Sequence, residues 1–228
     1  MEWITSENVA TAENATAEFI ATRLTQAAHE RGRATLAISG GRTPWRMFER
    51  LAAQDVTWDA VQIFQVDERV VPLEHEARNW KRFLANPLAR CIADANRHAM
   101  PVEIENPEQA AAQYANTLIE TAGEPPALDV VHLGIGADGH TASLFADDPL
   151  LEERQRWVGV SRPYENCRRL SLTLPVLNRA RCVVWFAVGA ARRGAMTRLF
   201  ARDAAIPASQ VERDRATCFT DPDAAPAM

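Results

Sequence analysis

Four short polar segments carry residue types that can perform acid–base chemistry or bind an anion. They are Ser39–Thr43, Asp67–Arg69, Gly134–His140 and Gly189–Arg193. The third is the most informative, because it places an Asp and a His two residues apart at the end of a glycine turn. An imidazole with an ordinary pKa of ~6.5 takes a proton from water near neutral pH, and a neighbouring carboxylate stabilises the imidazolium that forms. The pattern predicts a general base, His140, supported by Asp138.

The same turn also matches the dinucleotide-binding pattern G-x-G-x-x-G. That interpretation requires an acidic residue at the end of the next strand, ~20 residues further on. The chain has Val160-Ser161-Arg162 there, without a carboxylate. The Asp-x-His pair also lacks a second His or Cys at ligand spacing, so we expect no metal and no cofactor. A non-catalytic His, hydrogen-bonded inside a glycine turn, remains the simplest alternative.

The segment Ser39-Gly40-Gly41-Arg42-Thr43 has the composition of an anion-binding loop. Its two glycines allow the backbone to approach a ligand closely, while Ser39, Arg42 and Thr43 add hydroxyl donors and a charge. We expect a helix to begin at Pro44, capped by Thr43, with its free N–H groups directed at the ligand. Asp67–Arg69 allows two interpretations, a solvated ion pair or part of the same site.

Strands alternate with helices along most of the chain. Helices are expected at 7–31, 44–51, 79–91, 107–122 and 190–201, and strands at 34–38, 61–66, 128–132, 157–160, 169–174 and 182–188. Such alternation predicts a single α/β domain over residues 1–228, with a mostly parallel twisted sheet covered by helices on both faces. The four polar segments then follow strand carboxyl ends, where open α/β sheets bind their ligands.

The bulk composition excludes several other classes of protein. A net charge of −5 without a basic stripe argues against a nucleic-acid partner. No apolar stretch reaches the ~18 residues of a membrane span, and the first residues do not resemble a signal peptide. Four scattered cysteines are typical of free thiols in a reducing compartment. We therefore expect a cytoplasmic protein, as a monomer or a weak homo-oligomer, with a small-molecule partner.

Taken together and in order, four segments resemble the 6-phosphogluconolactonases, which share their fold with the glucosamine-6-phosphate deaminases. The segments are Ser39–Pro44, Val66–Pro72, Leu133–Phe145 and Arg169–Arg181. The deaminases resemble His-Ile-Ala-Phe-Asn-Glu-Pro after the His, whereas this chain has His140-Thr-Ala-Ser-Leu-Phe145 and no carboxylate before Asp147. The resemblance therefore favours the lactonase branch of the family.

The resemblance implies hydrolysis of 6-phosphoglucono-1,5-lactone in the oxidative pentose phosphate route, a phosphosugar lactone being the substrate. His140 would activate the water, Asp138 would orient His140, and the N–H groups near Gly136 and Gly139 would stabilise the oxyanion. Arg192 stands where the family commonly has a Lys that contacts phosphate. A sugar-phosphate isomerase or deaminase, and a non-catalytic sugar-phosphate sensor, remain the alternatives. The remaining residues expected to hold the phosphate or sugar hydroxyls are Ser39, Gly40, Gly41, Arg42, Thr43, Asp67, Arg69 and Arg169.

Overall fold

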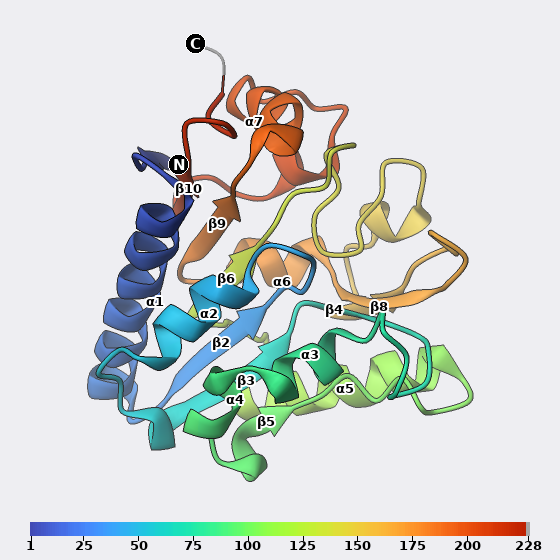
Figure 1. The fold of residues 1–228 in the computed structure, drawn as a ribbon. Coiled ribbons are helices and arrows are strands. Elements are labelled where there is room, and N and C mark those ends of the chain that lie inside the picture. Colours follow the sequence, from blue (N-terminus) through green and yellow to red (C-terminus); the bar gives the residue numbers. More distant parts are fainter. Residues whose placement is uncertain (227–228) are drawn as a thin grey trace.

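The computed structural model describes residues 1–226 and is built on a seven-stranded sheet whose strands all run parallel (Figure 1). This confirms the mostly parallel sheet predicted from the alternation of strands and helices. Its central strands are buried along their whole length, as expected for a sheet covered on both faces. In spatial order the strands are β1 (Glu2–Thr5), β10 (Ala216–Thr220), β9 (Val183–Ala187), β6 (Val130–Leu133), β2 (Ala34–Ile38), β3 (Val61–Gln65) and β5 (Arg97–His98).

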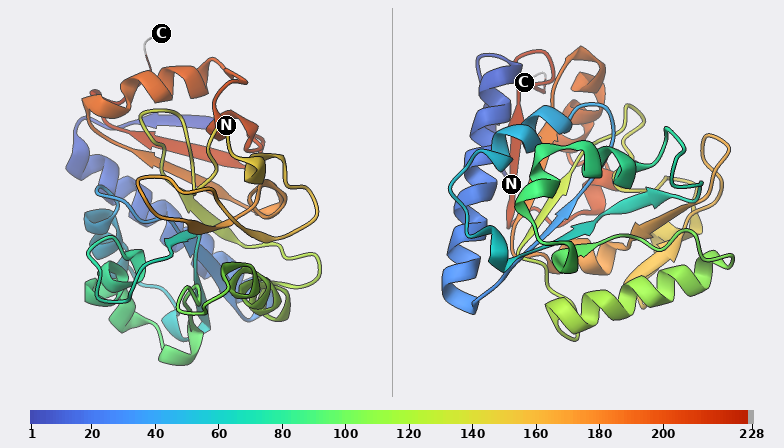
Figure 2. Two further views of the ribbon diagram at one scale, coloured as in Figure 1. Left: turned by 90° about the vertical axis from the view of Figure 1, so that its right-hand side faces the viewer. Right: turned by 60° about the horizontal axis from the view of Figure 1, so that its bottom comes forward.

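Helices cover the two faces of this sheet (Figure 2). On β2, Leu36 and Ile38 pack against the helices of residues 9–91 on one face, and Ala37 packs against those of residues 107–200 on the other. Successive side chains of a strand point to opposite faces. No helix within residues 1–226 is long and apolar enough to cross a bilayer. The helices of residues 9–91 are α1 (Val9–Arg31), α2 (Trp45–Ala52), α3 (Asn79–Ala85) and α4 (Pro87–Cys91); those of residues 107–200 are α5 (Pro107–Ala122), α6 (Leu174–Arg179) and α7 (Arg193–Phe200). Short 3₁₀ turns occupy Trp58–Ala60, Asp94–Asn96, Pro149–Glu152, Ala190–Arg192 and Pro207–Gln210.

A small antiparallel sheet stands beside the main one, formed in order by β4 (Asp67–Arg69), β8 (Arg169–Leu172) and β7 (Val158–Val160). Asp67–Arg69, expected only as the polar end of the strand 61–66, therefore forms a separate strand in a second sheet. Val66 connects the two sheets, because its N–H donates to Ile38 O of β2 and its carbonyl accepts from Leu172 N of β8. The polar face of β8 is also enclosed: Arg169 is only 3% exposed.

Several element ends differ from the sequence prediction. The helix predicted to begin at Pro44 begins at Trp45, and no side chain caps it, so Thr43 is not the predicted cap. The helix predicted over 79–91 is divided at Asn86, whose side chain caps α4 by accepting from Leu88 N. The edge strand β1, its neighbour β10 and the short helix α6 were not predicted. Gly32 does end α1 as expected, with φ 72°.

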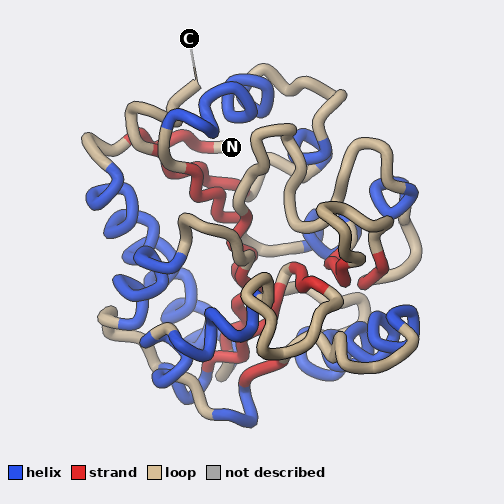
Figure 3. The backbone as a smooth tube through the Cα atoms, turned by 45° about the vertical axis from the view of Figure 1, so that its right-hand side comes forward, coloured by secondary structure: helices blue, strands red, loops and turns tan. Residues whose placement is uncertain are grey.

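The strand order reverses between β2 and β6. From β2 the chain proceeds to β3 and β5 on one side, then crosses to β6, β9 and β10 on the other. Ligands of open α/β sheets bind in the crevice outside the carboxyl ends of strands at such a reversal. Ser39 follows β2 directly, and Gly134 follows β6 directly. Figure 3 shows many of the long loops gathered on one side of the strands.

Candidate active site

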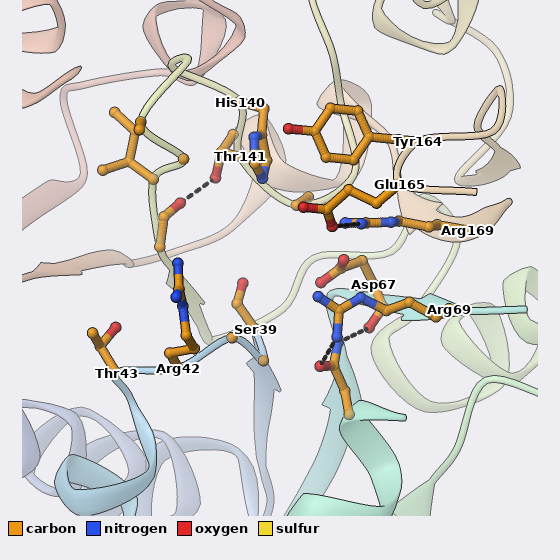
Figure 4. Close-up of a pocket in the computed structure, with 18 of the residues that line it drawn as sticks. Ser39, Arg42, Thr43, Asp67, Arg69, His140, Thr141, Tyr164, Glu165 and Arg169 are labelled. Carbon is orange, nitrogen blue, oxygen red and sulfur yellow. Dashed lines mark hydrogen bonds and ion pairs between the residues drawn. The ribbon is translucent and has the colours of Figure 1, made fainter. Parts of the chain in front are cut away.

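A cavity of about 540 Å³ opens at the carboxyl ends of β2 and β6 (Figure 4). It brings together all four polar segments identified in the sequence, although these lie up to about 150 residues apart along the chain. Of the predicted site residues only Gly139 does not line it. The lining includes Ser39, Gly40, Gly41, Arg42, Thr43, Asp67, Arg69, Gly136, Asp138, His140, Arg169 and Arg192.

The acid–base pair predicted from the sequence is assembled in the structure. Asp138 Oδ1 lies 2.6 Å from His140 Nδ1, and the two side chains are 50% and 23% exposed. Burial by itself raises the pKa of the Asp138 carboxyl, but the charge of His140 and its hydrogen bonds outweigh this and leave the pKa below its usual value. A carboxylate only accepts hydrogen bonds, so Nδ1 carries the proton and Nε2 of neutral His140 keeps its lone pair.

The glycine turn positions this pair through its own hydrogen bonds. Gly136 N donates to His140 O, and Gly139 N donates to Gly136 O. A Cβ on Gly136 would collide with His140 Nδ1 and Asp138 Oδ1, so only glycine fits there. Gly139 has φ +90° and packs against Ile206, away from the cavity. Both amides donate within the turn and so shape it, and stabilisation of an oxyanion by the N–H groups near them stays a prediction.

The anion-binding loop rests on buried side chains beneath it. Ser39 N donates to His132 Nδ1 (3.4 Å), and Ser39 Oγ donates to His132 O (3.0 Å). His132, predicted only to lie in a buried strand, is 1% exposed, and burial lowers its pKa to about 3. Gly40 approaches Asn79 so closely that a Cβ would overlap the Asn79 amide. No local pattern of residues marks this contact with His132, because the contact depends on the pairing of β2 with β6.

Arg42 and Arg192 bring two positive charges to one part of the cavity. Within residues 1–226, no carboxylate forms an ion pair with either guanidinium. Burial lowers the pKa of Arg192, and the nearby charge of Arg42 lowers it further. Two close cations without a bound counter-charge repel each other, so an anion between them is favoured. Such a pair of cations is expected of an anion-binding site.

Arg69 forms the facing side of the cavity and is held in place by Asn79. Its Nη1 donates to Ala77 O and to Asn79 Oδ1, both at 2.8 Å. Glu68, fully buried, accepts from the backbone N–H groups of Asn79 and Trp80 and so anchors the start of α3. Burial is the main cause that raises the pKa of Glu68. Asn79 lies outside the four polar segments, whereas Glu68 lies inside one of them but was not among the predicted site residues.

An aromatic wall next to His140 was also missed. Tyr164 stacks on Phe145, with ring centroids 4.1 Å apart and an interplanar angle of 12°. Arg169 Cζ lies 5.0 Å from the Tyr164 ring and 5.5 Å from the Phe145 ring. Figure 4 shows Tyr164 facing His140 across the mouth of the cavity. Nothing in the local sequence marks Tyr164, because it lies in an irregular loop between β7 and β8.

The lining of the cavity also includes the buried acidic side chain of Asp67. Asp67 is 6% exposed, and its Oδ2 accepts a hydrogen bond from Ser143 Oγ at 2.7 Å. Ser143 N in turn donates to Ser171 Oγ, which ties the segment after His140 to β8. Among residues 1–226, no group of three or more His, Cys, Asp or Glu side chains converges as a metal site requires.

Comparisons with known proteins show which family the chain resembles. Over 190 residues the chain is 40% identical to a 6-phosphogluconolactonase of Synechocystis sp., which covers 81% of this chain and 79% of that protein. The crystal structure of 6-phosphogluconolactonase from Thermotoga maritima superposes with a TM-score of 0.86 at 25% identity, covering 96% of this chain and 98% of that one. A monomeric glucosamine-6-phosphate deaminase has a TM-score of 0.84 at 14% identity over 98% of both chains, which shows a shared fold alone. The family model of the glucosamine-6-phosphate isomerases/6-phosphogluconolactonases matches residues 7–219, and the chain belongs to this family.

Proposed function

We propose that this protein hydrolyses 6-phosphoglucono-1,5-lactone to 6-phosphogluconate, as a carboxylic ester hydrolase of the pentose phosphate pathway. The observation that carries the proposal is the Asp138–His140 pair beside a cavity rich in unpaired arginine charge. The 40% identity to a 6-phosphogluconolactonase supports the same activity. A neutral base next to an anion site is what hydrolysis of a phosphorylated lactone requires.

In the proposed mechanism His140 Nε2 removes a proton from a water molecule while the water oxygen attacks the lactone carbonyl carbon. Asp138 stabilises the imidazolium that forms, through the hydrogen bond at Nδ1. The tetrahedral intermediate then breaks its bond to the ring oxygen, and His140 Nε2 returns the proton to that oxygen. The products are the open-chain hydroxyl and a carboxylic acid, which ionises in water. Such a base contributes about 10²–10⁴-fold.

The arginines would bind the phosphate and stabilise the charge that develops on the carbonyl oxygen. Arg42 and Arg192, with the hydroxyls of Ser39 and Thr43, supply the cationic part of the cavity and are proposed to hold the phosphate. Arg69 and Arg169 lie on the other side, where Figure 4 shows them facing His140. There they are proposed to hold sugar hydroxyls and the developing oxyanion.

The deaminase alternative is weaker, because the segment after His140 supplies no carboxylate to the cavity. Ser143 there donates its hydroxyl to Asp67, and Asp147 does not line the cavity. A non-catalytic sensor would not need the Asp138–His140 hydrogen bond. We further propose a single domain that acts in the cytoplasm, as a monomer or weak homo-oligomer and without nucleic acid; its four cysteines are free thiols, which fits a reducing compartment.

The proposal is tested by assaying freshly prepared 6-phosphogluconolactone with the wild-type protein and with His140→Ala. The lactone hydrolyses spontaneously, so each rate is read above a protein-free blank. We expect activity from the wild type and a loss of about 10²–10⁴-fold from His140→Ala. A wild type that does not exceed the blank would refute the function, and equal rates for the two proteins would refute the role of His140.

A further inference from the structure

We propose that Tyr164 is a positioning residue of the Asp138–His140 pair, which it holds through a hydrogen bond from its phenol and through contact of its ring with the imidazole. The inference rests on the proposed function for its kinetic consequence, but its electrostatic consequence is measurable without substrate. Tyr164 enters the site from the irregular loop between β7 and β8, far from the motif that contains Asp138 and His140.

Both oxygens of the Asp138 carboxylate have a partner in this arrangement. Oδ1 lies 2.6 Å from His140 Nδ1, and Oδ2 lies 3.4 Å from the Tyr164 hydroxyl. A carboxylate that is held at one oxygen only can rotate about its last bond and lose its alignment with the imidazole. The second contact restricts this rotation. The Tyr164 ring also lies against the imidazole, with centroids 5.6 Å apart.

Tyr164 can act in this way because its own position is fixed. Its ring stacks on Phe145, which is 8% exposed, and the buried Arg169 guanidinium lies over its face. Its backbone is paired with Cys167 in both directions, Tyr164 N to Cys167 O and Cys167 N to Tyr164 O. Glu165, between them, forms an ion pair with Arg169 at 3.0 Å. These contacts of the loop therefore hold the Tyr164 phenol in a fixed position.

The chemistry of the two groups determines which one donates. Burial raises the pKa of the Tyr164 phenol, and the negative charges of Asp138 and Glu165 raise it further, so the hydroxyl keeps its proton across the neutral range. The Asp138 carboxyl, with its lowered pKa, is ionised and can only accept. The phenol thus neutralises part of the charge that Asp138 presents to His140. The titratable and charged groups around His140 and Asp138 are Tyr164, Glu165, Arg169 and Arg192.

Removing the Tyr164 hydroxyl should shift the pH dependence of the reaction in one direction. Without the phenol, more of the Asp138 charge acts on His140, and the imidazolium becomes more favourable. The general base is then lost to protonation at a higher pH than in the wild type. A residue that served only to fill space would not produce this shift, because its hydroxyl would carry no electrostatic role.

The experiment compares Tyr164→Phe, which keeps the ring, with Tyr164→Leu, which removes both ring and hydroxyl. Cys167→Ser is the matched control in the same loop. For Tyr164→Phe we expect the acid limb of kcat/KM to move up by roughly 0.3–0.5 pH unit, kcat to fall about 2–5-fold and KM to stay within about twofold. Tyr164→Leu should also raise KM, because Arg169 loses its aromatic support. Cys167→Ser should match the wild type.

The second measurement is the NMR titration of the His140 imidazole in the free proteins, assigned by its loss in His140→Ala. The titration midpoint should rise in Tyr164→Phe by the same roughly 0.3–0.5 pH unit, whether or not the lactone is the substrate. An unchanged midpoint and an unchanged acid limb in Tyr164→Phe would overturn the inference. Kinetics of Tyr164→Phe identical to those of the wild type, with only Tyr164→Leu impaired, would reduce the role to packing and overturn it as well. If the wild type is inactive on the lactone but the His140 midpoint still rises in Tyr164→Phe, the proposed function is refuted and this inference stands.

Discussion

Replacing Asp138 by Asn removes one charge from the site and changes almost nothing else in shape. The Asn side chain is nearly isosteric with Asp, so its amide oxygen can still accept a hydrogen bond from His140 Nδ1, but a neutral one. What is lost is the negative charge that stabilises the imidazolium when His140 takes a proton from water. The change therefore tests whether Asp138 acts on the reaction or only on the fold.

The structure limits the size of the effect. The Oδ1–Nδ1 distance of 2.6 Å is that of a strong, charge-assisted hydrogen bond. Hydrogen bonds to charged groups contribute about 1.5–3 kcal/mol, which corresponds to roughly 10–150-fold in rate. Because the Asp138 side chain is 50% exposed, solvent screens its charge, and we expect the lower half of that range, a fall in kcat of about 10–40-fold.

The assay is steady-state hydrolysis of fresh lactone from about pH 5 to pH 9, corrected for spontaneous hydrolysis. The matched control is Asp147→Asn, since Asp147 is an exposed carboxylate in the same segment that does not line the cavity. Asp138→Asn should also move the acid limb of kcat/KM to lower pH, because a neutral neighbour favours the imidazolium less. This shift is opposite in sign to the one expected for Tyr164→Phe.

Two results would refute this reasoning. The first is a kcat for Asp138→Asn within twofold of the Asp147→Asn control, which would show that the carboxylate does not stabilise the transition state. The second is an acid limb that moves to higher pH, which would show that Asp138 does not act on His140 electrostatically. A fall in kcat accompanied by a lower melting temperature would point to the fold, so thermal unfolding is recorded for each variant.

Three further predictions concern the supports of the site. Arg192→Gln should raise KM for the phosphorylated lactone about tenfold or more, with kcat within twofold of the wild type. Hydrolysis of unphosphorylated gluconolactone should be unchanged. A KM equal to that of the wild type would remove Arg192 from the phosphate site. Gly136→Ala should lower kcat at least about tenfold, because its Cβ collides with His140 Nδ1, and kinetics like those of the wild type would contradict this crowding. Burial lowers the pKa of His132 to about 3, so the unfolded chain takes up a proton there before the folded one does. Protonation of His132 therefore does not lower the free energy of unfolding above about pH 6.5, but lowers it by up to about 1.4 kcal/mol per pH unit between there and pH 3. Urea unfolding of His132→Gln should not show this pH-dependent decrease. Parallel curves for the two proteins would contradict that assignment.

The predictions that succeeded rest on contacts between neighbours in the chain. Asp138 and His140 stand two residues apart, so one glycine turn is enough to bring them together. The strands 34–38 and 61–66 and the helix 107–122 were recognised from their own apolar runs and end signals, and the structure has them within one residue. The segments that were missed, β1, β10 and α6, are short and hold their place through the neighbours against which they pack.

The amino-acid sequence by itself determined the alternating α/β architecture, the acid–base pair and the polar segments that the fold brings to one cavity. Only the tertiary structure decided that Asp67–Arg69 forms a second sheet with β8, that His132 supports the anion-binding loop, and that Tyr164 contacts Asp138. The glycine amides expected at the oxyanion were likewise shown to donate within their own turn. The physical reason is how far apart in the sequence the contacting residues lie. Local patterns encode contacts within a turn or a helix, whereas contacts between segments 26 to 104 residues apart depend on strand order and on the path of irregular loops.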